Sequence, residues 1–255
     1  METILEVRDL CKTYIANKRQ NNVLKNVSFS VCEGEMVAVM GPSGSGKSTL
    51  LYTVSGMDSA TSGEVLFGGR SVAGLSESEL SALRLDEMGF IFQQMYMLKN
   101  LTVLDNIVLP AVQSKRNTAP KAEKLERGRA LMHRLGIAQI ADNDINEVSG
   151  GQLQRACICR SMINSPKMIF ADEPTGALNR GASEEVMAEL EGLNADGTTL
   201  MLVTHDARVA AKCSRVLFID DGCIKGEFTF VEKLPKTDMR ARERALNGWL
   251  LEMGW

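Results

Sequence analysis

Short apolar runs alternate along the chain with segments whose apolar residues recur at helical spacing. The runs are rich in β-branched residues and predict strands at residues 4–7, 27–31, 36–40, 64–67, 89–92, 168–171, 200–204 and 216–220. Short turns separate the early strands, which favours antiparallel pairing, whereas each later strand is reached through a helix, which favours parallel pairing. The pattern therefore predicts an α/β fold with crossover helices.

The middle of the chain lacks the strand pattern. Between residues 95 and 166 no such run recurs, and residues 120–135 and 149–164 predict helices. We therefore predict one domain at 1–231, with a core at 1–95 and 166–231 and a helical subdomain at about 96–165. Residues 232–255 form a predicted helical tail, which packs on its own domain or docks on a partner.

Composition narrows the function classes. The chain has 255 residues, 44% of them hydrophobic, and a net charge of −3, which argues against a nucleic-acid partner. No apolar run approaches the roughly 18 residues of a membrane span, and the start lacks a signal-peptide pattern, so we expect a soluble cytoplasmic protein. Six scattered cysteines without zinc-site spacing predict small buried side chains in a reducing compartment.

A glycine-rich segment directly follows the predicted strand at 36–40. Residues 41–48 fit the pattern G-x-x-x-x-G-K-[ST], whose backbone amides bind phosphate oxygens at a helix N-terminus. Lys47 would reach the β- and γ-phosphates, and the Ser48 hydroxyl would bind Mg²⁺. The candidate nucleotide-binding residues are Gly41, Ser43, Gly44, Ser45, Gly46, Lys47, Ser48 and Thr49.

Polar side chains follow three other predicted strands. Asp172 and Glu173 end the strand at 168–171, where Asp172 suits a Mg²⁺ shell and Glu173, pointing the other way on an extended backbone, could orient a water. His205 follows the strand at 200–204 and could bind a γ-phosphate oxygen. Gln93 or Gln94 offers an amide to Mg²⁺ or water at the entrance to the helical segment.

Together these residues resemble the ATP-binding cassette ATPases over about residues 4–226. The resemblance implies a P-loop NTPase fold with a RecA-like core, an antiparallel β subdomain and an α-helical subdomain, with Gln93 as the metal and water contact. It assigns Tyr14 to adenine stacking. It also implies a homodimer around two ATP molecules, in which one protomer caps the nucleotide of the other. The signature residues that carry this cap are Ser149, Gly150, Gly151 and Gln152, preceded by Val148 where the family usually has leucine.

One position departs from the family pattern. The segment at 176–179 ends in Asn179 where an aspartate is usual, which keeps hydrogen-bonding capacity but loses the charge. The lost charge would affect how strongly the two ATP sites communicate. Since Glu173 and His205 remain, we still predict ATP hydrolysis.

Three further stretches, at 41–69, 101–110 and 171–176, resemble the lipoprotein-releasing and macrolide-efflux branch. That branch implies a membrane permease as partner and a location on the inner face of the membrane. Residues 98–110 would form an exposed apolar groove for the permease. The segment that ends in Asn179 also resembles the corresponding segment of antimicrobial-peptide resistance ATPases. This second resemblance implies peptide export or mechanotransmission.

Other classes fit less well or remain open. A chromosome-maintenance ATPase needs long heptad arms between its glycine motifs, and a translation factor needs two cassettes in one chain. A regulatory switch on a membrane partner in cell division or signalling stays open. The permease, not this chain, would contact the cargo, so the sequence does not identify the substrate.

Overall fold

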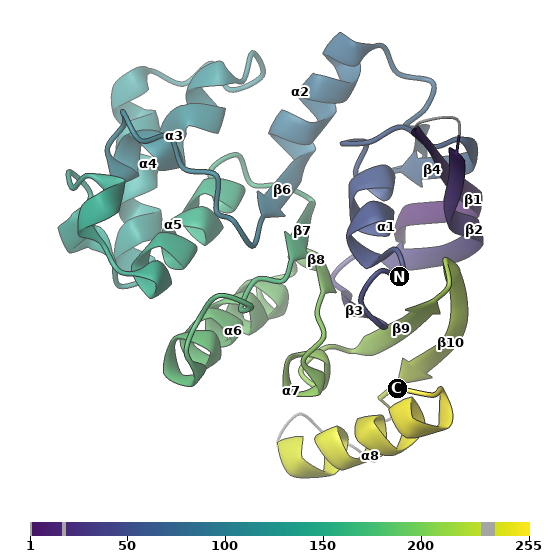
Figure 1. Ribbon diagram of the computed structural model, residues 1–255. Coiled ribbons are helices and arrows are strands. Elements are labelled where there is room, and N and C mark those ends of the chain that lie inside the picture. Colours follow the sequence, from purple (N-terminus) through teal and green to yellow (C-terminus); the bar gives the residue numbers. More distant parts are fainter. Residues whose placement is uncertain (1, 17–18, 231–237) are drawn as a thin grey trace. The chain divides into compact units, whose positions relative to one another are not determined.

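The computed structural model describes residues 2–16, 19–230 and 238–255. The chain divides into two compact units (Figure 1): unit 1 comprises Met1–Leu75 and Thr199–Trp255, and unit 2 comprises Ser76–Thr198. The predicted start of the tail at residue 232 lies outside the described residues. The predicted division into a core and a helical subdomain remains a prediction, and each unit is described here by itself.

The first sheet of unit 1 is antiparallel, as its short turns predict. Its strands are β1 (Thr3–Ala16), β2 (Arg19–Cys32), β4 (Ser62–Phe67) and β5 (Arg70–Ser71), in the order β2-β1-β4-β5. Both β1 and β2 run well beyond their predicted apolar stretches. The extensions are mostly polar, and they are held by pairing between the two strands and by the buried Leu10 and Leu24.

The other strands of unit 1 are β3 (Met36–Met40), β8 (Thr199–Val203), β9 (Arg215–Asp220) and β10 (Cys223–Thr229). β3 pairs in parallel with β8 and with β9, which confirms the predicted parallel arrangement. Every residue of β3 and β8 is buried, which is why both are continuous apolar runs. β10 pairs antiparallel with β9 and was not predicted, because its half-exposed residues form no apolar run.

Among its described residues, unit 1 has the helices α1 (Lys47–Val54), α7 (Ala207–Ala210) and α8 (Met239–Glu252). α8, yellow in Figure 1, packs on its own unit through Leu246 and Leu250, which are fully buried. Its Trp249 packs edge-to-face against Phe218 of β9, with ring centroids 6.2 Å apart. The buried Arg242 donates to the carbonyl oxygen of Ala211 at 2.7 Å. The tail helix is therefore part of the packed structure of unit 1.

Unit 2 contains β6 (Met88–Ile91) and β7 (Met168–Asp172), which pair in parallel. Between residues 95 and 166 the structure forms helices and no strand, as predicted, apart from one isolated bridge at Thr102. The helices of the unit, among them α3, which the sequence analysis missed, are α2 (Glu77–Glu87), α3 (Val103–Gln113), α4 (Lys121–Arg134), α5 (Gly150–Met162) and α6 (Arg180–Ala195), with short 3-10 turns at Ala138–Ile140 and Ile145–Glu147.

Helices α3 and α4 approach each other closely. A Cβ atom on Gly128 of α4 would lie 2.6 Å from a methyl carbon of Val108 and 2.9 Å from one of Leu104, both in α3. Glycine is therefore required where the two helices meet. Within the part of the chain that the structure describes, no helix is long and apolar enough to cross a bilayer.

The expectation that all six cysteines are buried is only half correct. Cys157, Cys159 and Cys213 are buried, but Cys11, Cys32 and Cys223 are half-buried. The exceptions lie on strands of the partly exposed parts of unit 1, where alternate residues face away from the core.

Candidate functional site

The segment at 41–48 forms a tight loop between β3 and α1. The amide of Ser45 donates to the carbonyl oxygen of Pro42 at 3.2 Å, and α1 begins at Lys47. No described side chain caps the N-terminus of α1. The positive end of the helix dipole at this terminus therefore favours an anion.

The glycines of this loop are required by its backbone. Gly41, Gly44 and Gly46 have φ angles of +156°, +80° and +103°. A Cβ atom on Gly41 would lie 1.9 Å from the carbonyl oxygen of Ile219, and one on Gly46 would lie 2.9 Å from that of Val23. Only glycine fits both the conformation and the space.

The polar side chains of the loop suit a phosphate group. Lys47 donates from Nζ to the carbonyl oxygens of Gly41 at 2.7 Å and Pro42 at 2.8 Å, which folds the ammonium group back over the loop. The Ser45 hydroxyl is buried and has no hydrogen-bond partner among the described residues. A buried hydroxyl of this kind is costly unless a ligand completes it.

Two further predicted residues belong to unit 1. His205 is exposed and follows β8, whose Val203 pairs with Val39 of β3. Since β3 and β8 are parallel neighbours, His205 and the loop at 41–48 leave the sheet at the same edge. Tyr14 lies near the end of β1, and 41% of its surface is exposed.

In unit 2, Asp172 ends β7 and is 7% exposed. Glu173 follows it with a φ of +48°, in the left-handed region. The expectation of an extended backbone at Glu173 is therefore wrong. The residue begins a turn in which its carbonyl oxygen accepts from the amide of Gly176 at 3.0 Å. A left-handed glutamate costs about 1–3 kcal/mol and is the kind of strain that occurs at functional sites.

Gln93 lies beside the same turn. A Cβ atom on Gly176 would lie 3.3 Å from Nε2 of Gln93 and 3.4 Å from Cβ of Glu173. Unit 2 therefore brings the predicted amide and the predicted catalytic carboxylate to one small glycine-lined space. Sequence spacing does not predict this proximity, because 80 residues separate the two side chains.

The sequence did not predict that Arg160 hydrogen-bonds the loop that follows Gln93. Met95 and Tyr96 have φ angles of +59° and +47°, an unfavourable conformation for side chains of their size. Arg160 of α5 donates to the carbonyl oxygens of both residues, with the bond to Tyr96 at 2.8 Å. These hydrogen bonds hold the strained loop against the helix that carries the signature residues.

The signature residues form the N-terminus of α5. Ser149 accepts from the amide of Gln152 at 3.3 Å, and Oε1 of Gln152 accepts from the amide of Ser149 at 2.9 Å, a reciprocal capping box. Gly150 and Gly151 have ordinary negative φ angles, unlike the glycines of the phosphate loop. A Cβ atom on Gly150 would approach no atom closer than 3.9 Å, so the fold of this chain does not require glycine there.

Asn179 caps α6. Its Oδ1 accepts from the amide of Ala182 at 3.0 Å. Both asparagine and aspartate cap helices well, so the change from the family pattern removes a charge without removing the cap.

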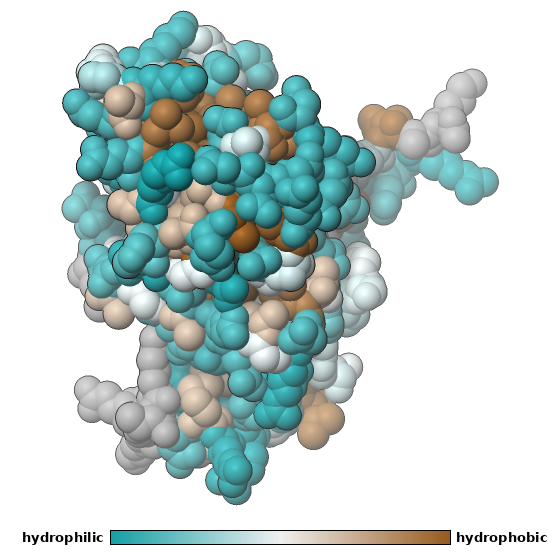
Figure 2. All heavy atoms as spheres, turned by 90° about the vertical axis from the view of Figure 1, so that its left-hand side faces the viewer, coloured by the Kyte–Doolittle hydropathy of each residue, from teal (hydrophilic) through white to brown (hydrophobic). Residues whose placement is uncertain are grey.

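Residues 98–110 do not form the predicted exposed groove as a whole. Val103, Leu104, Ile107 and Val108 are buried in unit 2, because α3 turns them toward α4 and α5. Figure 2, which faces the side of Figure 1 where these helices lie, shows brown hydrophobic patches within a mostly hydrophilic surface. The exposed large apolar side chains of this part of the chain are Tyr96, Leu98 and Val112.

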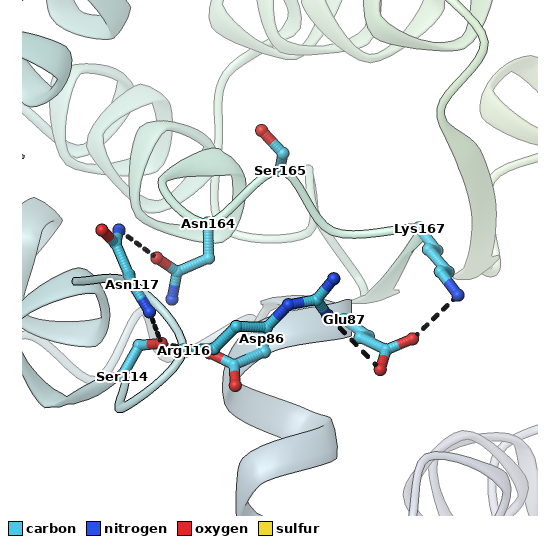
Figure 3. A pocket seen from close by; sticks show the side chains of 8 residues that line it. All are labelled: Asp86, Glu87, Ser114, Arg116, Asn117, Asn164, Ser165 and Lys167. Atoms are coloured by element: carbon cyan, nitrogen blue, oxygen red, sulfur yellow. Dashed lines mark hydrogen bonds and ion pairs between the residues drawn. The ribbon is translucent and has the colours of Figure 1, made fainter. Parts of the chain in front are cut away.

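A pocket of about 310 Å³ also lies in unit 2 (Figure 3). Its polar side chains pair with one another: Glu87 with Lys167 at 3.0 Å and with Arg116 at 3.7 Å, and Asn117 with Asn164 at 3.3 Å. Because its charges are already paired, the pocket has the character of a structural polar cluster and contains none of the predicted site residues.

The predicted site residues thus fall into two groups. Unit 1 contains Tyr14, the loop 41–49 and His205, and unit 2 contains Gln93, the segment 149–152, Asp172 and Glu173. Residues 24–176 match a family model described as ABC transporter.

Two relatives illustrate the similarity. The chain is 42% identical over 225 residues to the lipoprotein-releasing system ATP-binding protein LolD 2 of Rhodospirillum rubrum, covering 88% of this chain and 96% of that protein. It is 37% identical over 236 residues to the macrolide export ATP-binding/permease protein MacB of Pasteurella multocida, covering 92% of this chain and 36% of that protein. The chain therefore spans about a third of the length of this MacB relative.

Solved structures show the same fold. The ATP-binding cassette MJ0796, described as a dimeric post-hydrolysis state bound to ADP and Pi, matches with a TM-score of 0.83 and 36% identity over 88% of this chain and 98% of that one. A second dimeric structure of the same cassette matches with a TM-score of 0.83 and 37% identity.

Proposed function

Because this chain belongs to the ABC transporter family and is an ATPase of the LolD and MacB type, we propose that it drives a membrane permease by dimerising around two ATP molecules. The observation that carries this proposal is the loop at 41–48. Its glycines are fixed by backbone geometry, Lys47 lies over it, and Ser45 offers a buried hydroxyl. This is the arrangement that a triphosphate requires.

The proposal assigns a role to each predicted residue. The loop 41–49 binds the phosphates, Tyr14 stacks on adenine, and His205 contacts a γ-phosphate oxygen. Glu173 orients and deprotonates the attacking water, and the glycine-lined turn at Gly176 leaves room for Gln93 beside it. Mg²⁺ would neutralise charge on the phosphates, and the oxygen donors of Ser48, Asp172 and Gln93 are the ligand types that it prefers.

The glycines at 150–151 support the dimer. Gly150 is the first residue of α5, and this chain has room for a Cβ atom there. A glycine that the fold does not require suits a contact with something outside the chain. The γ-phosphate held by the partner protomer is such a group, since backbone amides at a helix N-terminus bind anions. The two dimeric cassette structures accord with this arrangement.

The permease would contact unit 2 near Leu98. The side chain of Leu98 is 47% exposed, while its backbone amide donates to Oδ1 of the buried Asn106 at 2.7 Å. Nδ2 of Asn106 donates back to the carbonyl oxygen of Leu98 at 3.1 Å. An apolar side chain held rigidly at the surface is suited to a partner helix. The LolD and MacB relatives are named for lipoprotein release and macrolide export. For this complex we propose antimicrobial-peptide resistance or mechanotransmission, which the segment ending in Asn179 supports.

The variant Glu173→Gln tests the chemistry. It removes the base but keeps the size of the side chain, so ATP binding should persist while turnover falls about 10²–10⁴-fold. The expected accompanying result is an ATP-dependent dimer in size-exclusion chromatography with multi-angle light scattering. Unchanged turnover would refute the role of Glu173.

The same variant, tagged and purified with ATP from detergent-solubilised membranes of its own host, tests the partner. A stoichiometric polytopic membrane protein is expected, and its loss in Glu173→Gln/Leu98→Glu would place the contact at Leu98. As a matched control, Leu251→Glu changes an exposed leucine of unit 1 and should retain the membrane protein. Recovery of soluble partners alone would contradict a transporter role. A cell-separation defect without a resistance phenotype would favour a regulatory switch.

A further inference from the structure

Tyr14 is held by charged neighbours that the nucleotide motifs do not include. Its hydroxyl donates to Oδ2 of Asp58 at 2.6 Å. The other oxygen of Asp58 accepts from Nζ of Lys12, also at 2.6 Å. Lys12 is only 6% exposed, and its ammonium nitrogen lies 4.8 Å from the centroid of the Tyr14 ring. The aromatic side chain is thus fixed at its hydroxyl by a carboxylate and at its ring by a cation.

The same network ties Tyr14 to the helix that follows the phosphate loop. The amide of Asp58 donates to the carbonyl oxygen of Tyr52 in α1 at 3.0 Å. The ring is therefore connected through Asp58 to the end of α1.

The protonation states keep this network intact near neutral pH. Burial, together with the hydrogen bond to Asp58, raises the pKa of Tyr14 above its ordinary value, so the phenol stays a donor. Burial alone would raise the pKa of Asp58, but the hydrogen bonds from Lys12 and Tyr14 outweigh it and hold that pKa below its ordinary value. The carboxylate therefore stays ionised.

We infer that Asp58 and Lys12 are positioning residues that lock the ring of Tyr14 at a fixed place relative to the phosphate loop. The inference rests on the proposed binding of ATP. A ring that is 41% exposed would otherwise be ordered only when the nucleotide binds. Ordering it in advance lowers the entropic cost of binding the base and leaves phosphate binding unchanged.

The test compares ATP with tripolyphosphate, which has phosphates but no base, by calorimetry on the full chain. Tyr14→Ala should weaken ATP binding about 10-fold or more, through lost stacking. Tyr14→Phe, Asp58→Asn and Lys12→Met should each weaken it about 3- to 10-fold, through lost preorganisation. Tripolyphosphate affinity should stay within about 2-fold throughout. The control Asp221→Asn breaks the exposed Lys25–Asp221 pair of unit 1 and should change neither affinity.

A double-mutant cycle separates positioning from a general structural effect. Asp58→Asn should have no further effect on ATP affinity in a Tyr14→Ala background, because no ring remains to position. An equal effect in both backgrounds would overturn the inference, as would a parallel loss of tripolyphosphate binding. If Tyr14→Ala leaves ATP affinity unchanged while tripolyphosphate still binds, the assignment of Tyr14 to the base fails and the positioning role fails with it. If neither ligand binds the unmodified chain, the proposed ATP site itself fails.

Discussion

The phosphate loop at 41–48 and the glycine pair at 150–151 both lead into a helix, but their glycines differ in backbone conformation. In the first loop, Gly41 and Gly46 have positive φ angles, and a Cβ atom would collide with carbonyl oxygens. At the second, φ is negative and a Cβ atom on Gly150 has room. The fold of this chain explains the first set of glycines, and it also leaves little room at Gly151, where a Cβ atom would lie 3.3 Å from Cβ of Ala182. Gly150 alone suits a contact outside the chain, as the proposed dimer requires.

The largest effect is expected at Gly46. The Cβ atom of an alanine there would lie 2.9 Å from the carbonyl oxygen of Val23 at a φ of +103°. Gly46→Ala should abolish detectable ATP binding and lower the free energy of unfolding by about 2–5 kcal/mol, because strain and overpacking add. Calorimetry with ATP and urea denaturation would measure both.

Gly68 provides the matched control for Gly46. It also has a positive φ, of +53°, but a Cβ atom on Gly68 would have nothing within 4 Å of it. Gly68→Ala should cost about 1–2 kcal/mol of stability and leave ATP binding intact. Equal loss of ATP binding in both variants would show that backbone strain anywhere in unit 1, rather than the phosphate loop itself, controls the site.

The next effect concerns Gly150, where stability and activity should change in opposite directions. Gly150→Ala should raise the free energy of unfolding by at most about 0.5 kcal/mol, since alanine is the better helix former but Gly150 is the first residue of α5. ATP binding by the monomer should persist, but hydrolysis should fall at least about 10-fold, because the methyl group would obstruct the partner's phosphate. A coupled-enzyme ATPase assay and urea denaturation would give both numbers.

The control for Gly150 is Gly192, within α6. Nothing lies within 4 Å of a Cβ atom there, so Gly192→Ala should raise the free energy of unfolding by about 0.5–1 kcal/mol with unchanged hydrolysis. If Gly150→Ala hydrolyses ATP as fast as the unmodified chain, the glycine pair does not contact a partner's nucleotide and the comparison between the two loops loses its functional meaning.

The sequence predicted the phosphate loop and the glycine pair at 150–151 far better than it predicted the strands and contacts around them. β3 and β8 were located within one residue because they are buried on both faces and form unbroken apolar runs. β10 was missed because its residues are half-exposed and include Gly226, which packs against Trp249 of α8. An apolar run in the sequence indicates a buried strand. A partly exposed strand such as β10, which pairs with one strand and packs against one helix, has no such run.

The motif residues themselves were identifiable, but the contacts that orient them were not. Asp58 lies 44 residues from Tyr14, and Arg160 lies 65 residues from Met95. Neither pair has a spacing that a local pattern could reveal. The left-handed backbone at Glu173 was also unpredictable, since nothing in its neighbours requires a positive φ. Tertiary contacts decide these features.

A smaller effect is expected at two of the helix caps of unit 2, those of α5 and α6. Ser149 caps α5 within a capping box, and Asn179 caps α6. Asn179→Ala should lower the free energy of unfolding by about 1 kcal/mol, whereas Asn179→Asp should not, because aspartate is an equally good cap. Urea denaturation measures the difference. If the two variants lose equal stability, the cap is not what Asn179 contributes.

The smallest effect is expected for the thiols of α5, on the buried side of the helix that begins with the glycine pair. Burial raises the pKa of Cys157 to about 11 and that of Cys159 to about 12. Thiolates are the reactive form, and a raised pKa keeps both thiols neutral as the pH rises from about 7 to about 9. Maleimide should therefore leave these two cysteines unmodified over that range, as followed by peptide mass spectrometry. The half-buried Cys223 serves as the internal control and should be modified. Rapid labelling of Cys157 at a pH of about 8 would show that α5 opens in solution, in which case the N-terminus of the helix could not hold a fixed geometry for a partner's phosphate.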